Sequence, residues 1–322
     1  LEDIQVMVQH QMPFQMGGYN CHGITLKQCD AYYMSDGSDV PGKDDCLGRG
    51  DGSSRVTGFV TEENKDQYKP LPVGVSLQYA NREPRFYASV AYNGSVWEMT
   101  TSYDEDKRFY RAWYYHGLEN GKLAQSPDLY LRTGIGVKKF YNPQDSYQNG
   151  GRIIHKTEPA IRYAEVLLIY AEALNELSSS YEISSWDGSK TYTIKRDEAE
   201  MAKGIEPIRI RAGVPNYKAE VYNNKDLFRK ALKRERQIEL FAEGHRYYDL
   251  RRWKDAPEEE ATMMYGCNTN IGENNRDLFY IPTVIPSMPS VFTKKMYFWP
   301  ISHDELKKNS RLTQNPGWTY YD

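Results

Sequence analysis

Ionisable side chains are most concentrated in residues 234–253, where acids, bases and one histidine alternate. On a helix, His245 and Asp249 would lie four residues apart and share a face. With Glu239 and Glu243 they could bind a metal or transfer protons, but the H-E-x-x-H spacing of zinc proteases is absent. A single histidine among long cationic side chains is also a poor site for a divalent metal. The alternating charges are more typical of ion pairs that hold a helix against its neighbours.

Other signatures of catalysis are absent from the sequence. There is no G-x-S-x-G motif for a nucleophilic serine and no phosphate-binding P-loop. Gly134-Ile135-Gly136 lacks a third glycine and precedes a strand-like run instead of a helix. A glycosidase with two catalytic carboxylates leaves no fixed spacing, because its pair forms only in the fold. No two acids stand out as such a pair, so we do not expect an enzyme.

Aromatic side chains indicate a different chemistry, since 27 tyrosines far outnumber the 10 phenylalanines and 6 tryptophans. Sugars present C–H faces that pack against aromatic rings, while their hydroxyls need polar side chains. The six candidate ligand-binding residues are Trp97, Tyr103, Trp113, Tyr114, Tyr115 and Asn93, and the polar residues Asp106 and Arg108 lie beside them. We expect the aromatic rings to stack on a ligand and the polar side chains to bind its hydroxyls. The alternative is that these rings pack the interior of a β-rich lobe.

The chain has four cysteines: Cys21, Cys29, Cys46 and Cys267. None lies in a C-x-x-C arrangement, so the paired ligands of a zinc site are missing. Cys21 and Cys29 could close a short loop in an oxidising compartment, whereas Cys267 is expected to be a free thiol. Residues 35–39 and 48–54 are acidic turns that could hold calcium, but they lack the order of ligands of an EF-hand. We expect solvated loops there, and no cofactor.

Length and charge narrow the class of protein. With 322 residues, the chain suits one large lobe or two coupled lobes. Its 41 Lys and Arg and 44 Asp and Glu give a net charge of −3, which lacks the basic field that nucleic acid or an anionic membrane attracts. The most apolar segment, 164–174, is interrupted by Glu165 and Glu172, so no membrane-spanning helix is predicted.

The first half of the chain has little helical periodicity. Residues 1–57 are rich in Gly and Asp and predict loops. Residues 85–92 and 95–100 flank Asn93-Gly94 and predict a β-hairpin. A further short strand is expected at 137–141.

From residue 157 the apolar residues recur with a period of 3.6. A helix is predicted from the cap Thr157 to Leu177, with Pro159 in its first turn, and a loop follows over 178–193. The next helix is expected over 198–212. It should end at Gly213 and break near Pro207. A long helix over 225–253 should bend at Gly244, and the chain after Pro257 should be loop-like.

Three segments carry motifs that occur together. Residues 162–176 read R-Y-A-E-V-L-L-I-Y-A-E-A-L-N-E, and residues 208–214 read I-R-I-R-A-G-V. Residues 243–253 read E-G-H-R-Y-Y-D-L-R-R-W and end the charged helix. In this order they resemble the C-terminal part of the SusD/RagB family, the surface nutrient-binding lipoproteins of Bacteroidetes. Glu83-Pro84-Arg85 is similar to the family's D-P-R, and residues 312–318 are similar to its terminal L-x-Q-N-P-G-Y, with Trp318 for the usual tyrosine.

The resemblance implies a mainly α fold: a tetratricopeptide-like helical scaffold with a loop-rich, partly β insertion lobe. Residues 1–157 would form the lobe, and residues 158–322 the scaffold with an irregular tail. The chain opens on Leu1, without Met, an export signal or a cysteine for lipidation. We therefore expect that the family's N-terminal helices and lipid anchor are missing from this chain.

The resemblance also implies a function. Members of the family are surface-exposed lipoproteins of the outer membrane that capture oligosaccharides and pass them to a SusC-like TonB-dependent transporter. Some bind peptides instead, and a polysaccharide-degrading enzyme is a further alternative. The matching motifs belong to the scaffold and transfer no ligand-binding residues. The site prediction therefore rests on the aromatic residues alone.

Overall fold

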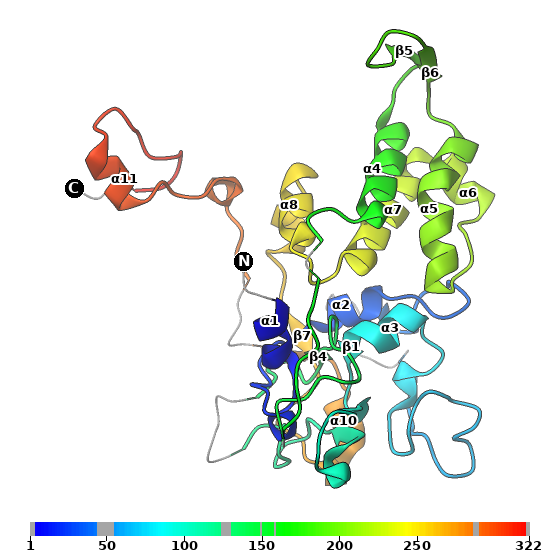
Figure 1. Ribbon diagram of the computed structural model, residues 1–322, viewed down its shortest axis with the longest axis vertical. Helices are drawn as coiled ribbons and strands as arrows, with labels where there is room; N and C mark the ends of the chain where they lie inside the picture. The colour runs from blue at the N-terminus through cyan, green and yellow to red at the C-terminus, as the bar shows by residue number, and fades with distance from the viewer. Residues whose placement is uncertain are drawn as a thin grey trace.

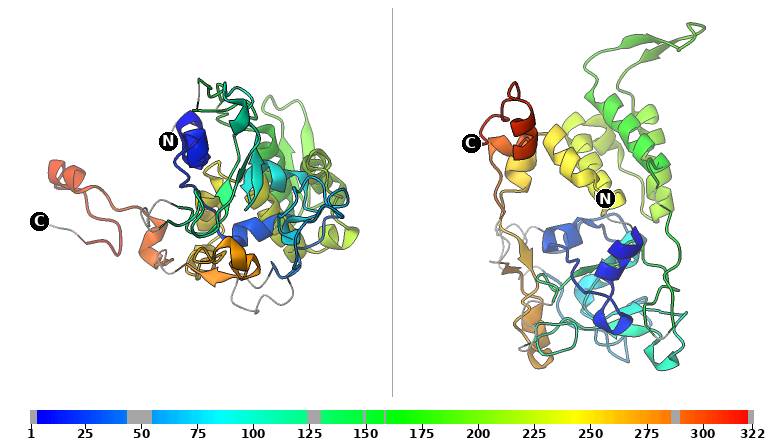
Figure 2. Two further views of the ribbon diagram at one scale, coloured as in Figure 1. Left: turned by 90° about the horizontal axis from the view of Figure 1, so that it is seen from below. Right: turned by 60° about the vertical axis from the view of Figure 1, so that its left-hand side comes forward.

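The computed structural model of this chain describes residues 4–43, 55–123, 130–148, 150–157, 159–285 and 290–319. Within these ranges the protein is mainly helical, and its strands pair only as small two-stranded sheets, which confirms the predicted fold class. Figure 1 shows helices α4 to α7 at one end and a lobe of short elements at the other. The C-terminal tail extends to one side (Figure 2). None of the helices in these ranges has both the length and the apolar composition needed to cross a bilayer.

The helical unit consists of α4 (Tyr163–Glu176), α5 (Glu198–Ala212), α6 (Ala219–Asn223) and α7 (Lys225–Glu239). Its core includes Leu168, Ala171, Met201, Ile205, Ile208, Phe228 and Leu232. Helices α4 and α5 approach closely at Gly204. A Cβ atom there would lie 2.5 Å from the carbonyl oxygen of Leu167 and 2.8 Å from the Cβ of Ala171. Glycine at this position therefore permits the contact between the two helices.

Helix α4 begins at Tyr163, later than the predicted cap Thr157. The preceding residue, Arg162, has an extended backbone, with φ −100° and ψ 145°. Its guanidinium donates hydrogen bonds to Glu239 and Glu243. These ion pairs hold the chain outside helical geometry just before Tyr163, so the predicted earlier start is wrong.

Helix α5 has the predicted bounds. The carboxylate of Asp197 accepts a backbone N–H of the first turn, and Gly213 ends the helix with φ +72°. The predicted break at Pro207 is wrong, because the helix continues through this residue. The isoleucines on either side of it are buried in the core, and their burial outweighs the backbone hydrogen bond that proline cannot form.

The predicted helix over 225–253 is two helices. Helix α7 ends at Glu239, and α8 (His245–Arg252) begins after a turn. Ala242 and Gly244 in this turn have φ +61° and φ +81°, which a right-handed helix cannot accommodate. The predicted bend at Gly244 is therefore a complete break.

The segment 178–193, predicted as a loop, contains a β-hairpin, so that prediction is wrong. Strand β5 (Tyr181–Ser184) pairs antiparallel with β6 (Thr191–Ile194). The pattern of alternating side chains is only four residues long on each strand, too short to stand out from the polar segment around it. The hairpin projects beyond the ends of α4 and α5 (Figure 1), and Trp186 in its turn is 98% exposed.

The lobe contains short helices and strand pairs around a second core. Its helices are α1 (Ile4–Gln11), α2 (Leu26–Ala31) and α3 (Pro84–Ser89). Its strands are β1 (Val90–Ala91), β2 (Ser95–Trp97), β3 (Tyr110–Ala112) and β4 (Gly136–Val137). The prediction of loops over 1–57 is wrong where α1 and α2 occur. These helices form because they bury Val8 and Leu26 in the core of the lobe.

The hairpin predicted around Asn93-Gly94 does not form. Pro84 begins α3, where its missing N–H costs nothing, so residues 85–89 are helical. Strand β1 pairs with β4, and β2 pairs with β3. The turn with Gly94 at φ +87° therefore joins strands of two different sheets.

From Ala256 onward the described part of the chain has only short elements. They are α9 (Ala256–Glu259), β7 (Tyr265–Gly266) paired with β8 (Thr283–Val284), α10 (Arg276–Phe279) and α11 (His303–Lys308). Single 3₁₀ turns lie at Phe14–Met16, Leu77–Tyr79, Glu105–Lys107 (η4), Glu273–Asn275 and Lys294–Tyr297. Cys267 and Phe279 join the core of the lobe, as does Ile238 of α7. Because the lobe core draws on both parts of the chain, the division at residues 157 and 158 stays a prediction.

Candidate functional site

The most strongly charged segment forms a buried ion network between the lobe and the helical unit. Glu235 of α7 has no solvent exposure, and both of its carboxylate oxygens accept hydrogen bonds. Arg85 of α3 donates to one oxygen at 2.7 Å, and Arg209 of α5 donates to the other at 2.7 Å. Arg85 also donates to Glu83 at 2.7 Å. The network thus connects three helices that lie far apart in the sequence.

A second carboxylate, one turn further along α7, extends this network. Glu239 forms ion pairs with Arg85 at 3.1 Å, Arg162 at 3.0 Å and Arg211 at 2.6 Å. Burial alone would raise the pKa of the Glu239 carboxyl, but the ion pairs, with Arg211 foremost, hold it below its usual value. The group is therefore charged at neutral pH and bound to three cations.

The acidic residues that could have formed a metal or acid–base site, Glu239, Glu243 and Asp249, are engaged in ion pairs. Asp249 accepts two hydrogen bonds from Arg236, at 2.9 and 3.0 Å, and a third from Arg252. His245 lies 3.5 Å from Glu165. Within the described ranges, no group of three or more His, Cys, Asp or Glu could hold a metal ion. The predicted ion pairs are confirmed, and their role is structural.

Four of the six predicted ligand-binding residues lie in the core of the lobe. Trp97, Tyr114, Tyr115 and Asn93 have exposed fractions of 0–2%. The ring of Trp97 meets that of Tyr141 edge to face, with centroids 4.8 Å apart. Asn93 accepts the backbone N–H of Tyr114 at 2.7 Å. These contacts correct the expectation of a ligand-facing role, because a ligand at the surface cannot reach enclosed side chains.

The other two predicted residues reach the surface. Trp113 is half-buried and stacks on Tyr115, with ring centroids 5.6 Å apart and planes inclined by 16°. Tyr103 is 80% exposed. Its ring lies so close to Gly150 that a Cβ atom there would come within 2.3 Å of it. One side of the Tyr103 ring is thus supported by the protein and much of the remainder is open to solvent.

Tyr103 belongs to a turn that carries a further exposed ring. Phe109 follows the 3₁₀ turn η4 and is 61% exposed, with φ +57°. The turn is held by Asp104, whose side chain accepts the backbone N–H of Asp106, and by Arg108, which donates to the carbonyl of Ser102 at 2.9 Å. We call residues 102–109 the aromatic turn. The sequence did not distinguish Phe109, because its exposure depends on a positive φ that no local motif indicates.

The acidic turns proposed for calcium are only partly described. In residues 35–39, the carboxylate of Asp36 accepts hydrogen bonds from the backbone and hydroxyl of Ser38. Asp39 forms ion pairs with Lys43 and Arg234. The second turn, 48–54, lies outside the described ranges. Carboxylates already bound to cations and hydroxyls offer less to a calcium ion.

The three described cysteines are not bonded to one another. Cys21 is exposed, while Cys29 and Cys267 are buried, so the suggested closure of a loop between Cys21 and Cys29 does not occur. The thiol expected at Cys267 is present. Burial raises the pKa of the Cys267 thiol to about 12 and also raises that of Cys29. Cys46 lies outside the described ranges.

These environments predict selective alkylation. In a Cys46→Ser protein at pH 8, iodoacetamide should label Cys21 and leave Cys29 and Cys267 unmodified, because buried thiols with raised pKa values have little reactive thiolate. Peptide mass spectrometry measures the labelling. The same protein in urea should be labelled at all three positions. Labelling of Cys29 in the folded protein would contradict the burial described here.

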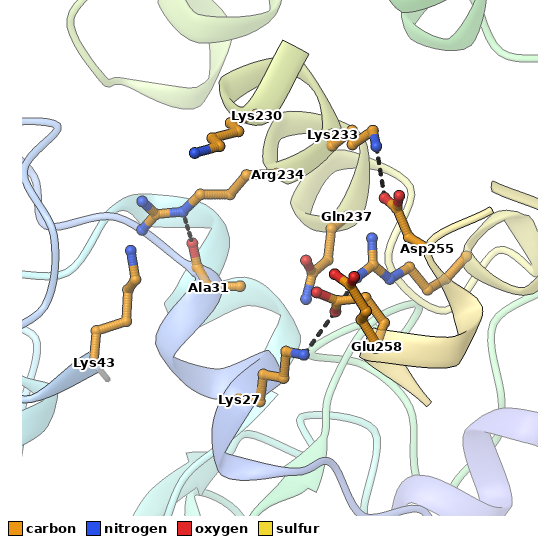
Figure 3. A pocket seen from close by; sticks show the side chains of 11 residues that line it. Lys27, Ala31, Lys43, Lys230, Lys233, Arg234, Gln237, Asp255 and Glu258 are labelled. Carbon is orange, nitrogen blue, oxygen red and sulfur yellow. Dashed lines mark hydrogen bonds and ion pairs between the residues drawn. The ribbon is translucent and has the colours of Figure 1, made fainter. Parts of the chain in front are cut away.

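A cavity of about 370 Å³ lies between α2, α7 and α9, and Figure 3 shows the side chains that line it. Six of them are cationic: Lys27, Lys43, Lys230, Lys233, Arg234 and Arg246. Three are acidic: Asp255, Glu258 and Glu259. We call this cavity the basic pocket. A net charge of −3 for the whole chain gave no indication of it, because its cations come from segments far apart in the sequence.

Comparison with known proteins identifies relatives over nearly the whole chain. The family model described as the SusD family matches residues 4–318. Among curated proteins, SusD-like protein P2 of Formosa agariphila is 29% identical over 184 residues, which are 56% of this chain and 30% of that protein.

Solved structures share the fold. The structure of BT4246 superposes with a TM-score of 0.72 at 22% identity, over 96% of this chain and 48% of that one. A SusD-like carbohydrate binding protein from Bacteroides fragilis superposes with a TM-score of 0.56 at 21% identity, over 96% and 51%. Another SusD-like protein from that organism gives 0.59 at 24% identity, over 92% and 47%. The chain thus spans about half the length of these relatives.

Proposed function

Because the chain belongs to the SusD family, we propose that it captures oligosaccharides and delivers them to a SusC-like TonB-dependent transporter. Proteins of this family are non-catalytic binding proteins and are known as outer-membrane lipoproteins. By this proposal the protein lies at the cell surface, as its relatives do, and it releases the sugar chemically unchanged. The described carbohydrate binding of one structural relative supports a sugar as the ligand class.

We place sugar contact at the aromatic turn, and one observation carries this assignment: the 80% exposed ring of Tyr103, supported from behind at Gly150. A ring that the protein holds on one side and leaves open on the other can stack on the C–H face of a sugar. Because the ring is already ordered, binding costs little side-chain entropy. Phe109 offers a second exposed ring. Asp106 and Arg108 supply polar groups for the sugar hydroxyls in the same turn. Trp113, half-buried beyond the turn, is the remaining predicted residue that could contact the ligand.

Calorimetric titration with neutral oligosaccharides and short peptides tests the proposal. We expect sugar binding by the native protein, weakened about two- to tenfold by Tyr103→Ala and by Phe109→Ala, since one aromatic contact contributes roughly 0.5–1.5 kcal/mol. Tyr192→Ala is the matched control, because Tyr192 is 52% exposed on the hairpin at the opposite end of the molecule (Figure 1).

Each other outcome changes the assignment. Binding of peptides without sugars would make peptides the ligand. Sugar binding unaffected by both variants would leave the function intact and remove the site from the aromatic turn. Conversion of the sugar would show a catalytic activity that the family assignment does not include.

A further inference from the structure

The lobe carries a second exposed ring, Tyr19, which the protein supports on one side as it does Tyr103. The Tyr19 side chain is 51% exposed. Its ring packs against the imidazole of His10 in α1, with centroids 5.0 Å apart and planes inclined by 37°. The backbone N–H of Tyr19 donates to the carbonyl of Gln9, and that of Cys21 donates to the carbonyl of His10, both at 3.0 Å. The loop that carries Tyr19 is thus held against α1, and the ring is ordered before a ligand arrives.

A cavity of about 430 Å³ lies beside this ring, between α1, β4 and the turn that joins α7 to α8 (Figure 1). His22 connects the two, because it lines the cavity and its ring lies 5.3 Å from that of His10. The volume is within the roughly 300–1,000 Å³ of small-ligand pockets. Met7 and Phe241 supply apolar surface to the cavity, and Thr25 and Arg132 supply polar groups. A sugar unit, with its C–H faces and hydroxyls, needs both kinds of surface.

Contacts of Tyr147 connect the Tyr19 loop to the aromatic turn. The backbone N–H of Tyr147 donates to the carbonyl of Met16 at 3.1 Å, and a Cβ atom on Gly17 would lie 2.8 Å from the Cβ of Tyr147. Gly150, three residues further along the chain, lies against the Tyr103 ring. Three residues span at most about 11 Å and two at most about 7 Å, so the Cα atoms of Gly150 and Tyr19 lie within about 25 Å of each other. An oligosaccharide of several units can span this distance.

We propose that Tyr19 and the adjoining cavity form a second sugar subsite, and that one long oligosaccharide contacts this subsite and the aromatic turn together. The class of ligand rests on the proposed function, whereas the second subsite rests on the supported ring and the cavity. The sugar stacks on the rings of Tyr19 and Tyr103, and its end unit enters the cavity past His22. A ligand bound at one subsite makes the second contact intramolecularly, so affinity rises with the length of the sugar.

Calorimetric titration tests the proposal with a homologous series of neutral oligosaccharides, from disaccharide to octasaccharide, of the sugar type that the native protein binds. We expect affinity to rise with length. Tyr19→Ala should bind the octasaccharide about two- to tenfold more weakly, and the gain with length should shrink accordingly. Tyr19→Phe, which keeps the ring, should bind as the native protein does. Tyr192→Ala is the matched control, because Tyr192 is 52% exposed and lies on the distant hairpin.

Cys21 provides a second measurement, which reports where the sugar lies. It is exposed and lines the cavity. In a Cys46→Ser protein, a saturating concentration of the octasaccharide should slow the labelling of Cys21 by iodoacetamide several-fold, because the end unit of the sugar covers the thiol. Labelling of free cysteine in the same solution is the control for any effect of the sugar on the reagent.

The outcomes separate this inference from the proposed function. Unchanged octasaccharide binding by Tyr19→Ala, or affinity that does not depend on length, would overturn the second subsite and leave sugar capture at the aromatic turn intact. Weaker binding by Tyr19→Ala without protection of Cys21 would overturn the role of the cavity. Binding of no sugar by the native protein would overturn the proposed function as well.

Discussion

Glu235→Gln should lower the free energy of unfolding by about 3–5 kcal/mol, the usual cost of removing one partner from a buried ion network. Its carboxylate is completely buried and bonded to Arg85 and Arg209, so the neutral amide removes the counter-charge of Arg209 and one of the three carboxylates around Arg85. Urea unfolding followed by circular dichroism measures the change. The variant retains the size of the side chain, which separates the loss of charge from the creation of a cavity.

Glu206→Gln is the control for Glu235→Gln. Glu206 is exposed on α5, and the same change of charge there should alter stability by no more than about 0.5 kcal/mol. Equal effects of the two substitutions would mean that the network contributes nothing beyond ordinary surface charge. Because Arg85 lies in the lobe and Arg209 in the helical unit, we also expect the two parts to unfold less cooperatively in Glu235→Gln.

Trp97→Ala should destabilise the protein by about 3–5 kcal/mol and leave sugar affinity unchanged under conditions where the variant is folded. The Trp97 ring is completely buried against Tyr141, so its loss creates a cavity that the short strands around it can only partly fill. Thermal unfolding and calorimetric titration of the same sample measure both quantities.

Trp186→Ala is the matched control, since Trp186 is 98% exposed in the turn of the hairpin and should contribute little to stability. If Trp97→Ala were as stable as the native protein but had lost sugar binding, Trp97 would be a ligand-binding residue after all. The pair of tryptophans therefore decides between the two uses of aromatic residues that the sequence left open.

The sequence predicts the long helices well because their apolar residues repeat over several turns. The bounds of α5 follow from Asp197 and Gly213, two residues whose chemistry acts locally. The complete break between α7 and α8 could not be predicted, because no local motif indicates the positive φ of Ala242. The start of α4 likewise depends on Arg162 reaching carboxylates near the end of α7.

The site was harder to predict than the fold, for a physical reason. Trp97 and Tyr103 both lie near polar residues in a loop-rich segment, yet one is fully buried and the other is 80% exposed. Burial in the lobe is decided by partners from residues 141 and 279–280, and the sequence around each ring does not contain that information. The family motifs were more informative about the fold, because the charged residues within these motifs form ion pairs with one another.

The hairpin of β5 and β6 also affects how readily α4 and α5 find each other. A long unpaired connection between two helices loses conformational entropy when the helices pack, and that loss grows with the logarithm of its length. Cross-strand contacts such as Ile183 with Tyr192 shorten the part of the connection that remains flexible. The flexible connection that must be closed when α4 and α5 pack is therefore shorter than the number of residues between the helices. The hairpin, though it contributes little to either core, thus lowers the entropic cost of the contact at Gly204.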